Sequence, residues 1–343
     1  MSIGNPEAFP WGSNTPTKLQ RAAFAFSVGA LGVLILLQKF ARLPNSATDF
    51  DLVWFGARLL RDGNDPYLLV GPHNFFYWDF PFLYPLPSLL VALPFSFLGV
   101  RTAALAFVFA GSSLLGYGAT KDGWHLLPMF ASSAFIDCAL TAQWSPLLVA
   151  GFFIPWIGAL CFAKPQLGLA VVSGSQSRAA LFAAAVGTLA LLTISFAILP
   201  NWFSEWAKVL GTADHMKAAL FQPLGFLIPV VLVRWRRAES WAVIVVAILP
   251  QTLMWYSVLI LLALPKTYRE ACVLSLLSSG GYFLVHLIAE NRPPVQPTGD
   301  ILWAVVVCTT FLPTVAAILR RPNRDSIPAW MTLLSKNTWA KVR

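Results

Sequence analysis

The chain has 343 residues, of which 57% are hydrophobic and only 11% are charged. With a mean hydropathy of +0.67, this composition excludes an ordinary soluble domain. The formal net charge of +9 does not indicate a nucleic-acid partner, because the basic residues lie in short connectors between apolar runs and not in one domain.

Many apolar runs have the length of a membrane-spanning helix, which is about 17–25 residues. The alternation of apolar and polar residues that marks a membrane β-barrel is absent from the sequence. We therefore expect an all-α fold, a polytopic helical bundle with about 10–12 transmembrane helices and interfacial helices on its outer face.

In chain order, we expect a cytoplasmic tail over 1–17, a single transmembrane domain over 18–320 and a second cytoplasmic tail over 321–343. Most Lys and Arg residues then fall in connectors on the inner side, as the positive-inside rule requires. This topology predicts an outer loop at 43–84 and a second outer loop at 200–222.

The interval between these two loops is harder to divide. Its apolar residues predict spans at 124–141 and 144–162, followed by a short segment at 165–175. Segments of this length can also be re-entrant, so both arrangements stay open.

Four cysteines lie singly inside apolar runs, which is typical of small buried hydrophobic side chains. They are Cys138, Cys161, Cys272 and Cys308. Neither they nor His73 and His125 have the spacing of a metal-ligand set with nearby acids. The sequence thus gives no reason to expect a metal or another cofactor.

The outer loop 43–84 is the longest polar interval between apolar runs and contains five of the fifteen acidic residues. They are Asp49, Asp51, Asp62, Asp65 and Asp79. Trp54 and Tyr67 lie among these acids. Carboxylates and aromatic rings beside a membrane indicate a site for a hydroxyl-rich ligand.

Residues 50–62 of this loop are predicted to form a short interfacial helix. Thr48 and Asp51 have the spacing of a capping box, in which Asp51 reaches back to the start of the helix, and Gly63 ends the helix. Asp51 is therefore either a structural cap or a catalytic acid. Asp49 lies where the first span ends and the helix begins, so its carboxylate faces either a cavity or solvent.

The run DFDLVWFGARLLRDGNDPY at 49–67, followed by YPLP at 84–87, resembles the polyprenol-phosphate-sugar-dependent glycosyltransferases of family 87, which are GT-C type membrane enzymes. Three later elements are similar to that family in the same order. AQWSP at 142–146 resembles its Gly-Gln stretch, AKPQ at 163–166 its Lys-Pro-Gln turn, and PQTLMWY at 250–256 its late Pro-x-x-Trp element.

The resemblance implies transfer of a sugar, with mannose expected, from a polyprenyl phosphate to a hydroxyl of a lipid or glycan acceptor, with inversion. The reaction would take place on the outer, periplasmic face of a bacterial inner membrane and would need no metal. By position in the family's first outer loop, Asp49 would be the general base, and Asp51 is the alternative.

Several residues would hold the donor if the resemblance is correct. The candidates for its phosphate are Lys164, His215 and Arg292, and those for the rest of the donor are Gln143, Trp54 and Tyr67. Each has a plainer interpretation. Lys164 has the position of a snorkelling lysine, and Trp54 has that of a membrane-interface anchor. His215 and Arg292 can be solvated loop residues.

Two further function classes fit a chain of this composition. One is a catalytically silent membrane subunit that serves as a scaffold in a complex. The other is a lipid or solute transporter in which Lys164 and Asp137 line a pathway, although the sequence has no detectable inverted repeat. Asp137 has the plainer interpretation of a buried, hydrogen-bonded acid.

Overall fold

The computed structural model describes residues 15–72, 74–76, 81–212, 217–251, 255–290, 299–323 and 327–332. Within these ranges the regular elements are helices, and the β pairing consists of two isolated bridges. The expected all-α fold is confirmed.

Five helical stretches in the described part of the chain are long and apolar enough to cross a membrane. They are α1 (Lys18–Arg42), α5 (Val100–Ala119), α9 (Arg178–Ile198), most of α13 (Tyr268–Glu290), and the continuous run of α14 (Gly299–Val306), η8 (Val307–Phe311) and α15 (Leu312–Leu319). The structure therefore confirms a helical membrane protein. The finer expectation of about 10–12 spans stays a prediction, since the other apolar helices are shorter.

The remaining elements are short helices between these spans. Before α5 lie α2 (Asp49–Arg61), α3 (Pro66–Leu69), α4 (Leu86–Ala92) and η1 (Leu93–Phe97). After α9 follow α10 (Trp202–Leu210), η5 (Ala219–Phe221), η6 (Gly225–Arg234), α11 (Ala238–Ile248), η7 (Trp255–Val258) and α12 (Leu259–Leu262).

The segment from Leu127 to Ser173 differs from its prediction, because it is divided into six short helices. They are η2 (Leu127–Ala131), α6 (Ser133–Leu140), α7 (Ser145–Val149), η3 (Ala150–Phe152), η4 (Pro155–Ala163) and α8 (Pro165–Ser173). Four of them begin with proline in the first turn. Proline has no N–H to donate, so it starts a helix readily and prevents a preceding one from continuing. The expected spans at 124–141 and 144–162 are therefore not single helices.

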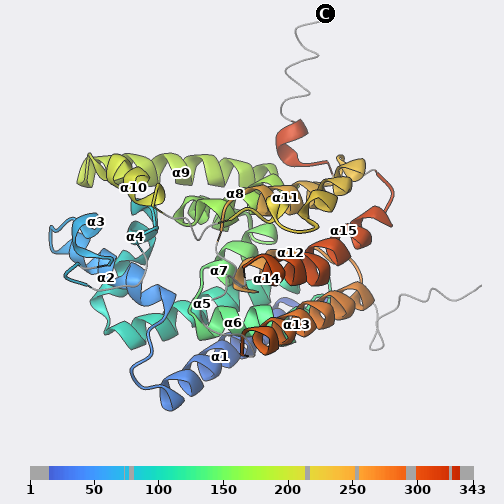
Figure 1. Ribbon diagram of the computed structural model, residues 1–343, viewed down its shortest axis with the longest axis horizontal. Coiled ribbons are helices and arrows are strands. Elements are labelled where there is room, and N and C mark those ends of the chain that lie inside the picture. The colour runs from blue at the N-terminus through green and yellow to red at the C-terminus, as the bar shows by residue number, and fades with distance from the viewer. Residues whose placement is uncertain are drawn as a thin grey trace, which may run out of the picture.

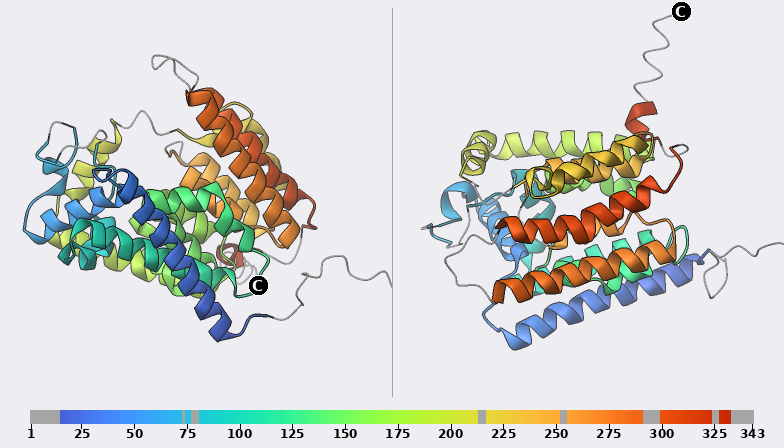
Figure 2. Two further views of the ribbon diagram at one scale, coloured as in Figure 1. Left: turned by 90° about the horizontal axis from the view of Figure 1, so that it is seen from below. Right: turned by 45° about the vertical axis from the view of Figure 1, so that its right-hand side comes forward.

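The long helices lie side by side, and several of the short helices gather at one end of them (Figure 2). α2, α3 and α10 lie at that end, whereas α15 finishes at the other (Figure 1). α1 packs on α5, and Gly116 makes this contact close, because a Cβ added there would lie 3.2 Å from the Cα of Ala25. Small residues at helix contacts allow such close approach in membrane proteins.

A network of charges joins three helices at the end opposite α2. Glu239 at the start of α11 is 3% exposed, and its carboxylate lies 3.4–3.6 Å from Arg237, Lys266 and Arg321. Arg321, which follows α15, also binds Glu270 of α13 at 2.5 Å. The network therefore ties the C-terminal helices to α11.

Part of the predicted C-terminal tail also contacts this region. The N–H of Ala329 donates to the carbonyl of Ser175 at 3.0 Å, and the indole of Trp330 donates to the carbonyl of Ser173 at 3.2 Å. Residues 327–332 are thus packed against the end of α8.

Replacing Glu239 by Gln should lower the free energy of unfolding by about 3–5 kcal/mol, because Arg237, Lys266 and Arg321 would lose the buried carboxylate that they share. Thermal unfolding of the purified protein in detergent measures this loss. Glu205→Gln is the matched control, since Glu205 pairs with the exposed Lys208, and it should change stability by less than about 1 kcal/mol. Equal effects of the two substitutions would show that the Glu239 network is not a stabilising clamp.

Candidate functional site

The start of α2 has the cap that the sequence predicts. The N–H of Thr48 donates to Asp51 Oδ2 at 3.1 Å, and the Thr48 hydroxyl donates to Asp51 Oδ1 at 2.6 Å. At the other end, Gly63 has a φ of 77°, and the N–H of Asn64 donates to the carbonyl of Leu59. The Asp51 carboxylate is thus directed at the start of its own helix. Of the two roles proposed for Asp51, this contact supports that of a structural cap.

Asp49, the first residue of α2, is held from both its backbone and its side chain. Its N–H donates to the carbonyl of Thr141 at 3.0 Å, and its Oδ2 accepts a hydrogen bond from the side-chain amide of Gln143. The two predicted site residues Asp49 and Gln143 therefore meet, although 94 positions separate them.

The end of α6 places Gln143. The N–H of Gln143 donates to the carbonyl of Cys138, and the N–H of Ala142 donates to the carbonyl of Ala139, which is the pattern of a Schellman motif. Ala142 adopts the left-handed conformation that this motif requires, with a φ of 51°. Glycine adopts that conformation at lower cost, so a motif with Gly before Gln would suit this turn.

Lys164 extends the chain of contacts by one residue. Its Nζ donates to Oε1 of Gln143 at 3.0 Å, and the lysine is 9% exposed. The Gln143 amide thus connects the carboxylate of Asp49 with the ammonium of Lys164: its NH₂ group donates to the carboxylate, and its oxygen accepts from the ammonium. We call these three side chains the Asp49–Gln143–Lys164 relay.

The position of Lys164 depends on close backbone packing. Lys164 precedes α8, and its carbonyl accepts from the N–H of Gly168 at 2.9 Å. A Cβ at Gly168 would lie only 2.0 Å from the carbonyl oxygen of Cys161. Only glycine lets the first turn of α8 approach η4 so closely, and this contact fixes the lysine.

Tyr256 covers the lysine. The Nζ of Lys164 lies 4.7 Å from the centre of the Tyr256 ring, which is a cation–π contact. The backbone of Tyr256 is held by α6, since its N–H donates to Asp137 Oδ2 at 3.1 Å and its carbonyl accepts from the Cys138 thiol. Asp137 thus accepts a hydrogen bond from the backbone, as its plainer interpretation expects.

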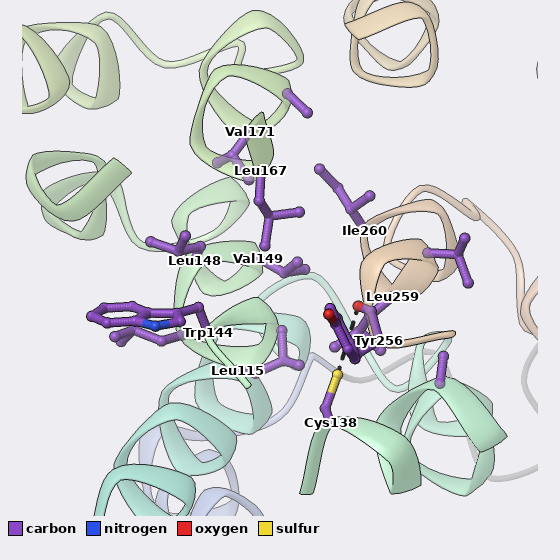
Figure 3. Close-up of a cluster of buried hydrophobic side chains, with 14 of the residues drawn as sticks. Leu115, Cys138, Trp144, Leu148, Val149, Leu167, Val171, Tyr256, Leu259 and Ile260 are labelled. Atoms are coloured by element: carbon purple, nitrogen blue, oxygen red, sulfur yellow. Dashed lines mark hydrogen bonds between the residues drawn. The ribbon is translucent and has the colours of Figure 1, made fainter. Parts of the chain in front are cut away.

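Apolar side chains lie around Tyr256 (Figure 3). They come from α7, α8 and α12 and are exemplified by Val149, Leu167 and Leu259, which are at most 4% exposed. A buried ammonium such as that of Lys164 interacts more strongly with a nearby carboxylate than it would in water.

Sequence reasoning missed two residues beside the relay. Lys39, near the end of α1, donates through Nζ to the carbonyls of Ala47 at 2.8 Å and Leu140 at 3.0 Å, and so fixes the segment that precedes α2. Tyr84 lies near enough for the Asp49 carboxylate to raise the pKa of its phenol, beyond the rise that burial causes. The sequence signal for Lys39 was its position in the last turn of the first span. Many snorkelling lysines have the same position, so this signal does not single it out.

The other candidates do not join the relay. The indole of Trp54 donates to the carbonyls of Phe95 at 3.1 Å and Leu98 at 3.2 Å, and the hydroxyl of Tyr67 donates to the carbonyl of Tyr84 at 3.1 Å. Both side chains are buried and have structural contacts. His215 and Arg292 lie outside the described residues.

The environment makes Asp49 more basic than an ordinary aspartate. Burial raises its pKa, while Lys164, the hydrogen bond from Gln143, and Lys39 oppose this rise without cancelling it. A carboxylate whose pKa is raised in this way, next to a specific cation, is typical of a functional site. The relay can accept a proton at Asp49 and stabilise negative charge at Lys164.

Among the described residues, no three His, Cys, Asp or Glu side chains are placed to hold a metal ion. The chain matches no protein-family model, no curated protein and no solved structure.

The cap at the start of α2 can be tested separately from the relay. Asp51→Asn should lower the free energy of unfolding by about 1 kcal/mol, because the amide cannot accept both hydrogen bonds from Thr48. Chemical or thermal unfolding in detergent measures the change. Asp62→Asn, at the exposed end of the same helix, is the control and should change stability by no more than about 0.5 kcal/mol. A loss as small as the control's would show that Asp51 is not needed as a cap.

Proposed function

We propose that this chain is a membrane glycosyltransferase that moves a sugar, with mannose expected, from a polyprenyl phosphate to a hydroxyl of a lipid or glycan acceptor, with inversion. One observation carries the proposal. Four separate sequence elements resemble a family of such enzymes, and one residue from each takes part in a single chain of contacts. These residues are Asp49, Gln143, Lys164 and Tyr256.

The chemistry assigns a role to each end of the relay. Asp49 removes the proton from the acceptor hydroxyl as its oxygen bonds to the anomeric carbon of the sugar. On the opposite face of that carbon, the bond to the phosphate oxygen breaks, and the phosphate leaves with the electron pair. Lys164 stabilises the charge that develops on the phosphate, through an N–H not used by Gln143.

The amide of Gln143 sets the distance between the two roles. It keeps Asp49 from pairing directly with Lys164, so neither charge is fully neutralised by the other. A directly paired carboxylate would be a poor base, because a neighbouring cation lowers its pKa. The inserted amide thus preserves the basicity of Asp49 and leaves N–H groups of Lys164 available to a phosphate.

The same proposal includes the orientation in the membrane. α15 finishes at the end of the bundle opposite α2 (Figure 1), and the basic residues Arg320 and Arg321 follow it. The positive-inside rule would place that end in the cytoplasm. Asp49 would then work on the outer face, which in a bacterium is the periplasmic face of the inner membrane.

Asp49→Asn tests the proposal directly. The amide keeps the shape of the side chain but cannot act as a base, so turnover should fall by about 100- to 10,000-fold. Transfer is measured with purified protein and polyprenyl-phosphate mannose, with the arabinose donor in parallel. The cap variant Asp51→Asn is the control and should keep most of the activity. Transfer that survives in Asp49→Asn would exclude Asp49 as the base, and no transfer from any donor by the wild type would favour a scaffold or a transporter.

The pH dependence provides a second test. Asp49 must be ionised to act as a base, and its pKa is raised, so kcat/KM should fall on acidification at a pH above the ordinary aspartate pKa of about 3.9. Lys164 is the strongest of the influences that lower this pKa. Lys164→Met should therefore move the acid limb of the pH profile to higher pH, in addition to reducing turnover. A limb that stays in place would show that Asp49 is not the group that titrates.

A further inference from the structure

A second charged region lies far from the relay, where α11, α13 and α15 meet at the end of the bundle (Figure 1). Hydrogen bonds hold its parts together. Arg234 donates twice to the carbonyl of Leu319, at 3.1 and 2.8 Å, and Arg237 donates to the carbonyl of Pro322 at 2.8 Å. The N–H of Arg236 donates to the side chain of Asn323. The linker before α11 is thus fixed against the end of α15.

Among the described residues, the cations of the ion-pair network outnumber the acids that they pair with. The carboxylates in these ion pairs are those of Glu239 and Glu270, which are engaged by Arg237, Lys266 and Arg321. Three further arginines adjoin residues of this network along the chain and have no ion pair within the described part of the chain. These are Arg236, Arg269 and Arg320, all of them exposed. We call these three residues the arginine rim.

The arginine rim borders a surface that suits lipid. Trp235 is 47% exposed, and the guanidinium of Arg236 lies 5.2 Å from the centre of its ring. Tyr268, next to Arg269, is exposed, and one to two turns further along α13 the apolar side chains of Val273 and Leu276 are also exposed. Exposed aromatic side chains between an apolar helix face and a basic surface are typical of the level at which headgroups lie.

We propose that the arginine rim binds the phosphate groups of acidic phospholipids in the adjacent leaflet. Guanidinium groups suit phosphate because they donate two parallel hydrogen bonds to it. The buried Glu239 network holds the rim in place, since each of its arginines directly precedes a residue of that network, namely Arg237, Glu270 or Arg321. This proposal does not depend on the activity of the relay.

The test compares lipid binding by the wild type and by the triple variant Arg236→Gln/Arg269→Gln/Arg320→Gln. Each protein is reconstituted in nanodiscs of phosphatidylcholine with a spin-labelled or fluorescent phosphatidylglycerol probe. The wild type should enrich phosphatidylglycerol at its surface, and higher salt should weaken this enrichment. The triple variant should bind the probe roughly 100-fold more weakly, given the usual contribution of a basic residue near an acidic headgroup.

Two further variants make the result specific. Arg42→Gln/Arg58→Gln/Lys208→Gln removes three exposed charges at the α2 end of the bundle and should leave the enrichment unchanged. Arg236→Lys/Arg269→Lys/Arg320→Lys keeps the charges and should retain most of it, which excludes loss of packing as the cause. The proposal is overturned if the wild type does not prefer phosphatidylglycerol, or if the two glutamine variants lose equal amounts of it. Saturation by free glycerol phosphate at the concentration of the lipid would indicate a soluble anion instead.

Discussion

The candidate site depends on one amide placed between two opposite charges. Carboxylates and ammonium groups are costly to enclose in an apolar environment unless each has a partner. Gln143 supplies both partners at once, because it donates to Asp49 and accepts from Lys164. The short helices around it can therefore hold a carboxylate and an ammonium close together without a direct ion pair, and the rest of the region serves to hold that amide in place.

Most of the supports for the amide are backbone contacts. The Schellman turn at Ala142 orients Gln143, and the contact of Gly168 with Cys161 brings Lys164 to it. Lys39 fixes the segment that leads into α2. Side-chain packing then closes the surroundings, with Tyr256 over the ammonium. The site is thus built from chain turns whose geometry tolerates little change.

The sequence predicts the parts of this protein that depend on local pattern. Long apolar runs predict α1, α5 and α9, and the pair Thr48 and Asp51 predicts the start of α2. The order of motifs selects Asp49, Gln143 and Lys164 as site residues. Their meeting, however, depends on contacts across 94 and 21 positions, which no local pattern contains.

Other features also depend on contacts that local pattern does not contain. The indole of Trp54 donates to two carbonyls at the end of η1, because α2 packs there. Likewise, apolar residues at 124–162 predict long spans. The prolines in that interval divide it into short helices instead. Mean hydropathy does not predict this division, because it does not register where a backbone N–H is missing.

The broken segment from Leu127 to Ser173 has a consequence for how the protein is made. Irregular backbone at membrane depth is stable only where other parts of the protein cover it. Here α6 packs on α13 and α8 packs on α11, and both covering helices come later in the chain. The segment that carries Gln143 and Lys164 therefore reaches its final position only after α11 and α13 have been synthesised and inserted. Assembly of the relay is a late event in biogenesis, although its residues lie in the first half of the chain.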